Sequence, residues 1–148
     1  MSFIKINIEE KTNIKSNIFI NNENNLILAV FEGNYNEGSK GNLDGLYIFS
    51  KIASYYFLYD TIAVMLLDFR NLNYKFGNTL LKSLNFFEEI GRDDEEKSKF
   101  VFILVSKQNL NPILDLLKMK TKKNYIIYED YNKAINDSLQ YARRYLEE

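Results

Sequence analysis

The chain has 148 residues, a hydrophobic content of 46% and a formal net charge of −1, values typical of one globular domain with a real core. It contains no Cys and no His, which excludes disulfides, thiolate or imidazole metal sites, and catalysis by Ser-His-Asp or Cys-His groups. Charges of both signs are spread along the chain, which argues against the clustered basic face of a nucleic-acid-binding protein. We therefore expect a single domain over residues 1–148, with no cofactor and no metal.

The chain shows no pattern of export or membrane insertion. Its first ten residues include acids and have no continuous apolar core, unlike a signal peptide. The longest apolar run, residues 62–67, is too short to span a bilayer. We expect a cytoplasmic protein without membrane contact. The abundance of Asn, Lys and Ile is typical of an AT-rich bacterial genome.

Three strands are predicted in the N-terminal part of the chain. Residues 3–8 alternate apolar and polar side chains, the period of a half-buried strand, and residues 17–20 form a second short strand. The Asn-rich segment 21–25 predicts a turn, because Asn tolerates the left-handed backbone. Residues 26–31 follow as a buried strand, so the region is expected to form a hairpin against the edge of a sheet.

A Gly- and Asn-rich loop over residues 32–41 leads to the first predicted helix, for which Asn42 is the expected N-cap. Apolar residues at helical spacing form its expected inner face: Leu46, Phe49, Ile52, Ala53, Tyr56 and Phe57. The strand over residues 62–67 is apolar on both faces, as in the centre of a parallel sheet. A polar loop that begins at Asp68 then leads to a second helix near Gly77.

The second helix is expected over residues 77–90, with Gly91 at its end and a solvated charged loop over residues 92–97. Its expected inner residues are Leu80, Leu81, Leu84 and Phe87. The next buried strand covers residues 100–105. A short helix follows, with Asn111 as cap and Pro112 at its first position. Its expected inner residues are Ile113, Leu116 and Leu117.

A last strand over residues 125–128 precedes a final helix that Asp130 caps. The expected inner residues of this helix are Ala134, Ile135, Leu139, Ala142 and Leu146. The elements therefore follow the order β-β-β-α-β-α-β-α-β-α. Strands that alternate with helices call for a parallel sheet with crossover helices. The fold class is α/β: a mixed, mostly parallel sheet of about five strands with flanking helices and an antiparallel N-terminal edge.

Four segments of the C-terminal half carry a family resemblance: residues 100–106, 112–117, 125–130 and the pair Ala134-Ile135. They are similar to the closing strand-helix-strand-helix of the STAS domain (sulfate transporter and anti-sigma-factor antagonist), with its "lleltgl"-type helix, its short strand ending in an acid and its "eAl" helix. Residues 68–72, Asp-Phe-Arg-Asn-Leu, resemble the family's Asp-Leu-x-x-Val segment after the central strand. The resemblance covers residues 24–146 and implies a STAS-like order of elements, although the first helix and its Gly-rich loop match poorly.

The resemblance also shows a departure. Anti-sigma-factor antagonists carry an Asp-Ser-Ser-Gly-like motif at the start of the helix after the central strand, and a kinase partner phosphorylates one of its serines. The alignment sets residues 76–79, Phe-Gly-Asn-Thr, against that motif, with Asn78 at the phosphorylated position. A neutral Asn cannot supply the charge change of such a switch. Thr79 would accept phosphate only if the alignment shifts by one residue.

The candidate partner-binding site is the polar loop with the start of the second helix: Asp68, Arg70, Tyr74, Gly77, Asn78 and Thr79. Free backbone N–H groups at a helix start can bind an anion or a carboxylate. The alternative is an ordinary N-cap in which Asn78 or Thr79 bonds the first turn. Asp68 and Arg70, two residues apart, point the same way, and their alternative role is a local ion pair worth about 0–1 kcal/mol if exposed.

Other clusters have weaker patterns. The acidic run over residues 93–96 lacks the ligand spacing of a calcium loop and is expected to be a solubilising loop. Lys118, Lys120, Lys122 and Lys123 are expected to form a solvated helix end. Two roles remain open for the surplus of Tyr, an interface or packing across helix edges with the hydroxyl in water. The residues concerned are Tyr47, Tyr55, Tyr56, Tyr59, Tyr125, Tyr128, Tyr131, Tyr141 and Tyr145.

The sequence thus predicts a non-catalytic interaction or regulatory module that presents the surface near residues 77–79 to a protein partner. A second hypothesis is an immunity or antitoxin-type protein that blocks one toxin. A third is an enzyme that uses Asp68, Tyr74 and Lys75, which would require a deep pocket beside Asp68. Self-association through exposed aromatic helix faces, giving a homodimer, remains open.

Overall fold

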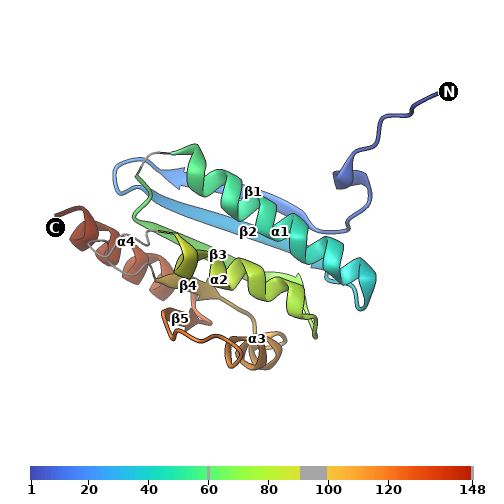
Figure 1. Cartoon of the computed structure of the whole chain (residues 1–148). Helices are drawn as coiled ribbons and strands as arrows, with labels where there is room; N and C mark the ends of the chain where they lie inside the picture. Colours follow the sequence, from blue (N-terminus) through green and yellow to red (C-terminus); the bar gives the residue numbers. More distant parts are fainter. Residues whose placement is uncertain (60, 91–99, 148) are drawn as a thin grey trace.

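The computed structural model describes residues 1–59, 61–90 and 100–147. Five strands form one sheet in the order β1-β2-β3-β4-β5 (Figure 1). They are β1 (Lys15–Asn21), β2 (Leu26–Asn34), β3 (Val64–Asn73), β4 (Val101–Leu104) and β5 (Tyr125–Tyr128). β1 pairs antiparallel with β2, and the other neighbours pair parallel. The predicted α/β class, the five-stranded mixed sheet and its antiparallel N-terminal edge are confirmed.

Helices cover both faces of the sheet. They are α1 (Ser39–Leu58), α2 (Leu81–Glu89), α3 (Leu110–Leu117) and α4 (Tyr131–Glu147). α1 and α2 lie on one face and α4 on the other (Figure 1). The side chains of β3 alternate between the two cores, because Met65 and Leu67 pack in the core of α1, α2 and α3, while Val64 and Leu66 pack in the core of α4. The strand predicted as apolar on both faces is therefore the central strand.

The strand predicted over residues 3–8 is wrong. These residues form an arm that projects from the body of the molecule and ends in a 3-10 turn, η1 (Ile8–Glu10), which Asn7 caps (Figure 1). Phe3 is 86% exposed and Ile4 is 88% exposed. Alternation gives a segment two different faces, but a strand also needs an edge to pair with. The order of the elements therefore begins β-β-α.

The start and inner face of α1 also differ from the prediction. The helix begins at Ser39 with Gly38 as N-cap, so Asn42 lies inside its first turns. Its buried residues are Gly41, Asp44, Gly45, Tyr47, Ile48 and Ile52. Two expected inner residues face solvent instead: Leu46 is 45% exposed and Phe57 is 67% exposed. The prediction followed the large apolar side chains, but the face of α1 that packs most closely contains Gly41 and Gly45, which have no side chain to mark it.

β3 extends to Asn73, so most of the polar loop predicted from Asp68 belongs to the strand. The second helix begins with the 3-10 turn η2 (Asn78–Leu80) before α2. α3 begins at Leu110 after Asn109, and the predicted cap Asn111 lies in its first turn.

The cap of α4 is confirmed, since the N–H of Asn132 donates to the Asp130 carboxylate at 3.0 Å. Helix α3 buries its three predicted residues. The predicted loop over residues 92–97 lies outside the described residues.

Candidate partner-binding site

The six residues of the predicted site lie on two faces of the sheet. Tyr74 belongs to the core of the α1 face, and Gly77, Asn78 and Thr79 lead from there into α2. Asp68 and Arg70 lie on the α4 face, where the guanidinium of Arg70 is 4.8 Å from the ring centroid of Tyr131 at the start of α4. The structure thus divides the predicted site into an α1-side group and an α4-side group.

The α1-side group is held from beneath. The hydroxyl of Tyr74, which is 2% exposed, donates to the carbonyl of Gly77 at 2.8 Å. The Thr79 hydroxyl donates to the side-chain oxygen of Asn42 on α1 at 2.6 Å. Neither Asn78 nor Thr79 caps the helix through its side chain, because the N-cap position is Gly77. The N-cap alternative is therefore wrong, and Thr79 instead links the loop to α1.

Glycine allows α1 to approach this loop closely. A Cβ on Gly45 would lie 2.6 Å from the Tyr35 hydroxyl and 2.8 Å from the Thr79 Cβ. Gly77 has φ +135°, and a Cβ there would lie 2.9 Å from the Tyr35 ring, so a side chain at this position would be both strained and crowded. The Gly-rich loop and first helix, which match the STAS pattern poorly, therefore have a packing reason for their composition.

Two tyrosines fill the space beneath the loop. Tyr35 and Tyr74 meet edge to face with ring centroids 5.0 Å apart. Burial raises the pKa of Tyr74 to about 12. The pKa of Tyr35 is also raised, mainly by burial and to a smaller extent by its electrostatic interaction with Tyr74. Both hydroxyls are therefore neutral at physiological pH and serve packing rather than proton transfer.

The outer side of the same loop faces solvent. Lys75 and Asn78 are exposed, and Phe76 is 57% exposed. On α1, Asn42 and Leu46 are exposed one helical turn apart, so they lie on one face of the helix. The exposed part combines two apolar side chains with amide groups and one lysine. We call it the loop-helix surface, formed by residues 75–79 with Asn42 and Leu46.

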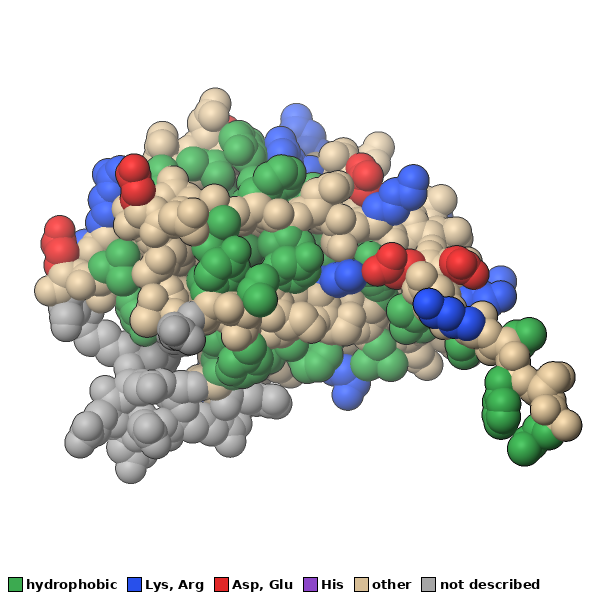
Figure 2. Space-filling model, turned by 90° about the horizontal axis from the view of Figure 1, so that it is seen from above, with side chains coloured by type: hydrophobic (Ala, Val, Ile, Leu, Met, Phe, Trp, Pro, Cys, Tyr) green, Lys and Arg blue, Asp and Glu red, His purple; other side chains and the backbone are tan. Residues whose placement is uncertain are grey.

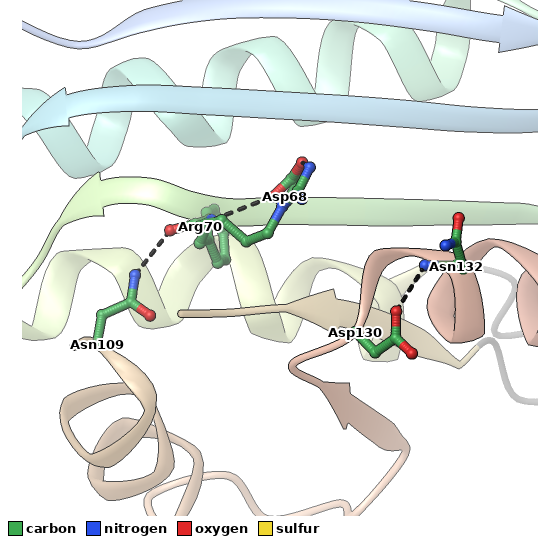
Figure 3. A network of polar contacts seen from close by, with 6 residues as sticks. Asp68, Arg70, Asn109, Asp130 and Asn132 are labelled. Atoms are coloured by element: carbon green, nitrogen blue, oxygen red, sulfur yellow. Dashed lines mark hydrogen bonds and ion pairs between the residues drawn. The ribbon is translucent and has the colours of Figure 1, made fainter. Parts of the chain in front are cut away.

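The α4-side group, Asp68 and Arg70, is a bidentate ion pair. The Arg70 guanidinium donates to both carboxylate oxygens of Asp68, at 3.0 and 2.9 Å, and the Arg70 backbone N–H donates to the same carboxylate at 3.1 Å (Figure 3). The hydrogen bond to Asp68 raises the pKa of Arg70. The Asp68 side chain is 3% exposed and that of Arg70 is 38% exposed. The ion pair of the alternative reading is present, but its carboxylate is buried.

Sequence reasoning missed Asn109, which joins this strand to α3. Pairing passes from Val30–Asp68 to Glu32–Asn71, so β3 contains one more residue than β2 between these pairs, a β-bulge. The buried amide of Asn109 donates to the Phe69 carbonyl at 2.7 Å (Figure 3). It also donates to the Leu72 carbonyl at 2.9 Å and so satisfies two backbone carbonyls at the bulge.

The one local sign of this role is Ser106, three residues earlier. Its N–H and hydroxyl donate to the Asn109 side-chain oxygen. That spacing predicts a side-chain turn, but no local pattern points to contacts with a strand 37 and 40 residues away.

Asp44 is a second residue that sequence reasoning missed. It is 1% exposed and accepts hydrogen bonds from the Thr12 hydroxyl at 2.6 Å, the Asn36 N–H at 2.8 Å and the Asn36 side-chain amide at 3.0 Å. Its carboxylate thereby ties the segment before β1 and the loop after β2 to α1. Its position on the buried stripe of α1, between Gly41 and Ile48, is the signal that a buried polar partner exists.

The cluster of the enzyme hypothesis does not form. Asp68 is engaged by Arg70 on the α4 face, Tyr74 donates to Gly77 on the α1 face, and Lys75 is exposed. These three side chains do not converge on one reacting atom, which general acid-base chemistry requires.

Of the weaker clusters, the acidic run over residues 93–96 lies outside the described residues. Lys120 is not solvated as expected, because its ammonium is buried and donates to the Leu84 carbonyl at 3.0 Å and to Glu88. Among the tyrosines of α1, Tyr47 is buried and its hydroxyl shares a hydrogen bond with Ser16 at 3.1 Å. Tyr59 is 39% exposed.

Comparisons place the fold. No family model matches the chain, and no curated protein matches it. The structure is similar to the crystal structure of an anti-sigma factor antagonist from Mycobacterium paratuberculosis, with a TM-score of 0.62 and 10% sequence identity over 84% of this chain and 93% of that chain. The chain therefore has the STAS-like fold that its sequence predicts. Within the described part of the chain, no helix is both long and apolar enough to cross a membrane.

Proposed function

We propose that residues 1–148 act as a single STAS-like module that regulates a protein partner by binding it, without chemistry of its own. The proposed contact surface is the loop-helix surface around Gly77, Asn78 and Thr79. The observation that carries the proposal is a loop held from beneath by Tyr74 and from the α1 side by Asn42, while its outer side chains stay exposed.

Rigidity favours binding at this surface. A partner that meets an already ordered loop does not have to offset the entropy of ordering it. The Thr79–Asn42 and Tyr74–Gly77 hydrogen bonds and the close approach at Gly45 supply that order. Loops on a rigid scaffold carry binding function disproportionately often.

The chemistry of the surface suits a protein rather than a small charged ligand. Phe76 and Leu46 offer exposed apolar area, and the amides of Asn42 and Asn78 can form hydrogen bonds around them. An apolar centre with a polar surround is the usual anatomy of a protein interface. Asp68 and Arg70, on the other face, are outside this surface, and Tyr74 supports it from below.

The similar structure belongs to an anti-sigma factor antagonist, so we propose a regulatory protein as the partner. Asn78 stands where the family resemblance sets the phosphorylated serine, and Asn accepts no phosphate. The Thr79 hydroxyl is already bound to Asn42, so its phosphorylation would break the contact between loop and helix. We therefore propose binding that does not depend on a phosphate at residue 78.

The test is affinity capture from a lysate of the native cells, with the full-length chain as bait. Asn78→Arg places a long charged side chain on the proposed surface, and Asn132→Arg places the same side chain at an exposed position at the start of α4. We expect a partner that the wild type and Asn132→Arg retain and that Asn78→Arg loses, with unchanged circular dichroism for all three. A partner that Asn78→Arg retains equally, or the absence of any captured protein, contradicts the proposal.

A further inference from the structure

The N-terminal arm, residues 1–8, is apolar and yet lies away from the core. Ile6 is 79% exposed and Ile8 is 53% exposed, and Phe3 and Ile4 are exposed further still. In Figure 2 the arm projects from the body, with apolar side chains near its end. An exposed run of apolar residues on a folded protein indicates a contact that the single copy leaves unmade.

The sheet has an open edge of matching length. β1 pairs with β2 on one side, and within the described residues no strand pairs with its other side. An edge of this kind presents free N–H and C=O groups to any further strand, and proteins usually protect it with Pro, bulges or several charges. β1 has Lys15 as its one charged residue, and Phe19 in its middle is 56% exposed.

The arm and β1 have the same pattern of faces. In β1, Ile18 and Ile20 lean on the core of the α1 face, while Asn17 and Phe19 point to the opposite side. An extended arm repeats this arrangement, because Ile4 and Ile6 then share one face and Phe3, Lys5 and Asn7 share the other. Added beside β1, the arm would continue the isoleucine row over the α1 layer and set Phe3 on the side of Phe19.

The arm of one copy is directed away from its own edge. The segment between the arm and β1 is anchored, because the Thr12 hydroxyl donates to Asp44 and Ile14 is 3% exposed. Glu9 adds an ion pair to Lys51 on α1. From this anchor the arm extends outward (Figure 1), so pairing with its own β1 would require the anchored turn to reverse.

We propose that two copies of this chain dimerise by exchanging arms, so that residues 3–7 of each copy, which precede η1, add a sixth strand to the β1 edge of the other. A two-fold axis makes both exchanges identical, and the closed pair leaves neither an arm nor a β1 strand unpaired. Main-chain hydrogen bonds supply the affinity and the alternating side chains supply the register. The contact involves neither the loop-helix surface nor the aromatic helix faces.

The test is the molar mass of the full-length protein, measured by light scattering or sedimentation over two decades of concentration. Ile6→Pro removes a backbone donor from the exposed arm without touching the core. Asn132→Arg, an exposed position on α4, serves as the surface control. We expect a dimer for the wild type and the control. For Ile6→Pro we expect a dissociation constant raised by about two orders of magnitude, because each dimer contains the change twice.

Cross-linking checks which strands meet, since the chain contains no Cys. Lys5→Cys and Asn17→Cys, prepared as separate proteins and then mixed, should form a mixed disulfide dimer. Lys5→Cys mixed with Lys133→Cys should not.

A monomeric wild type, or an Ile6→Pro dimer whose dissociation constant equals that of the wild type, overturns the proposal. A monomeric wild type would mean that the arm does not pair with a second copy. A dimer unaffected by Ile6→Pro would mean that a different face joins the two copies. Asn78→Arg should leave the molar mass unchanged, so this proposal and the proposed partner-binding surface can fail separately.

Discussion

Asp44 and Asp68 are both buried carboxylates, one associated with each face of the sheet, but they are stabilised differently. Asp44 accepts hydrogen bonds from neutral donors on Thr12 and Asn36, 32 and 8 residues away. Asp68 is bound by the guanidinium of Arg70, two residues along the same strand. Asp44 therefore joins segments that are distant in the sequence, whereas within the described residues Asp68 accepts hydrogen bonds only from Arg70 on its own strand, and the Arg70 side chain stays partly in solvent. The comparison predicts that loss of Asp44 is the more damaging.

The largest effect is expected from Asp44→Ala. The variant leaves the Thr12 hydroxyl and both Asn36 donors without their acceptor and should lower the free energy of unfolding by about 3 kcal/mol. Urea denaturation at neutral pH measures it. The matched control is Asp115→Ala, since that side chain is 74% exposed and its removal should cost less than about 0.5 kcal/mol. Equal losses for the two variants would show that Asp44 does not tie the N-terminal segments to α1.

The intermediate effect belongs to the Asp68–Arg70 pair, and a double-mutant cycle isolates it. Arg70→Ala alone leaves a buried carboxylate with only a backbone donor and should cost about 2 kcal/mol, reduced from the fully buried case by the exposure of Arg70. With Asp68→Ala added, the coupling should be about 1–2 kcal/mol. The exposed Asp115–Lys118 pair, treated in the same way, should give about 0.3 kcal/mol. Equal coupling in the two cycles would contradict the distinction between them.

These cases explain which parts of the molecule the sequence predicts well. Local periodicity identified β2 to β5, α3 and α4, although Leu146, an expected inner residue of α4, is 44% exposed. The same rule fails for residues 3–8, which alternate apolar and polar side chains but pair with no strand in the described part of the chain. It also fails for the inner face of α1, where Gly41 and Gly45 pack most closely and contribute no apolar signal.

The candidate site was divided by a feature that periodicity cannot reveal. Asp68 and Tyr74 are an even number of residues apart, so alternation places both on one face of an ideal strand. The bulge adds one residue to β3 between them and reverses the alternation. Phe69 and Leu72 consequently share the α1 face although they are three residues apart. Two carbonyls at the bulge accept hydrogen bonds from Asn109, which belongs to a segment distant in the sequence.

The smallest effect at neutral pH, and the sharpest test of the neutral character of the α1 side, is expected from Tyr74→Phe. The change removes the hydrogen bond to the Gly77 carbonyl and should cost about 1 kcal/mol near pH 8. The wild type has an additional pH dependence, because burial raises the pKa of Tyr74 to about 12 against about 10 in the unfolded chain. Below pH 10 both states hold the proton and the wild-type advantage is complete.

Between pH 10 and pH 12 the unfolded chain ionises first, so the folded state binds more protons and its stability falls as pH rises. Tyr74→Phe lacks this group and loses less. The difference in unfolding free energy between the two proteins should therefore narrow over this range and change sign before pH 12, because the shift in the pKa of Tyr74 outweighs the single hydrogen bond. Urea denaturation at several pH values measures the difference, with circular dichroism confirming the fold at each. A difference in unfolding free energy that stays constant up to pH 12 would mean that the Tyr74 hydroxyl is in contact with water. The loop of residues 75–79 would then not rest on a buried pair formed by Tyr35 and Tyr74.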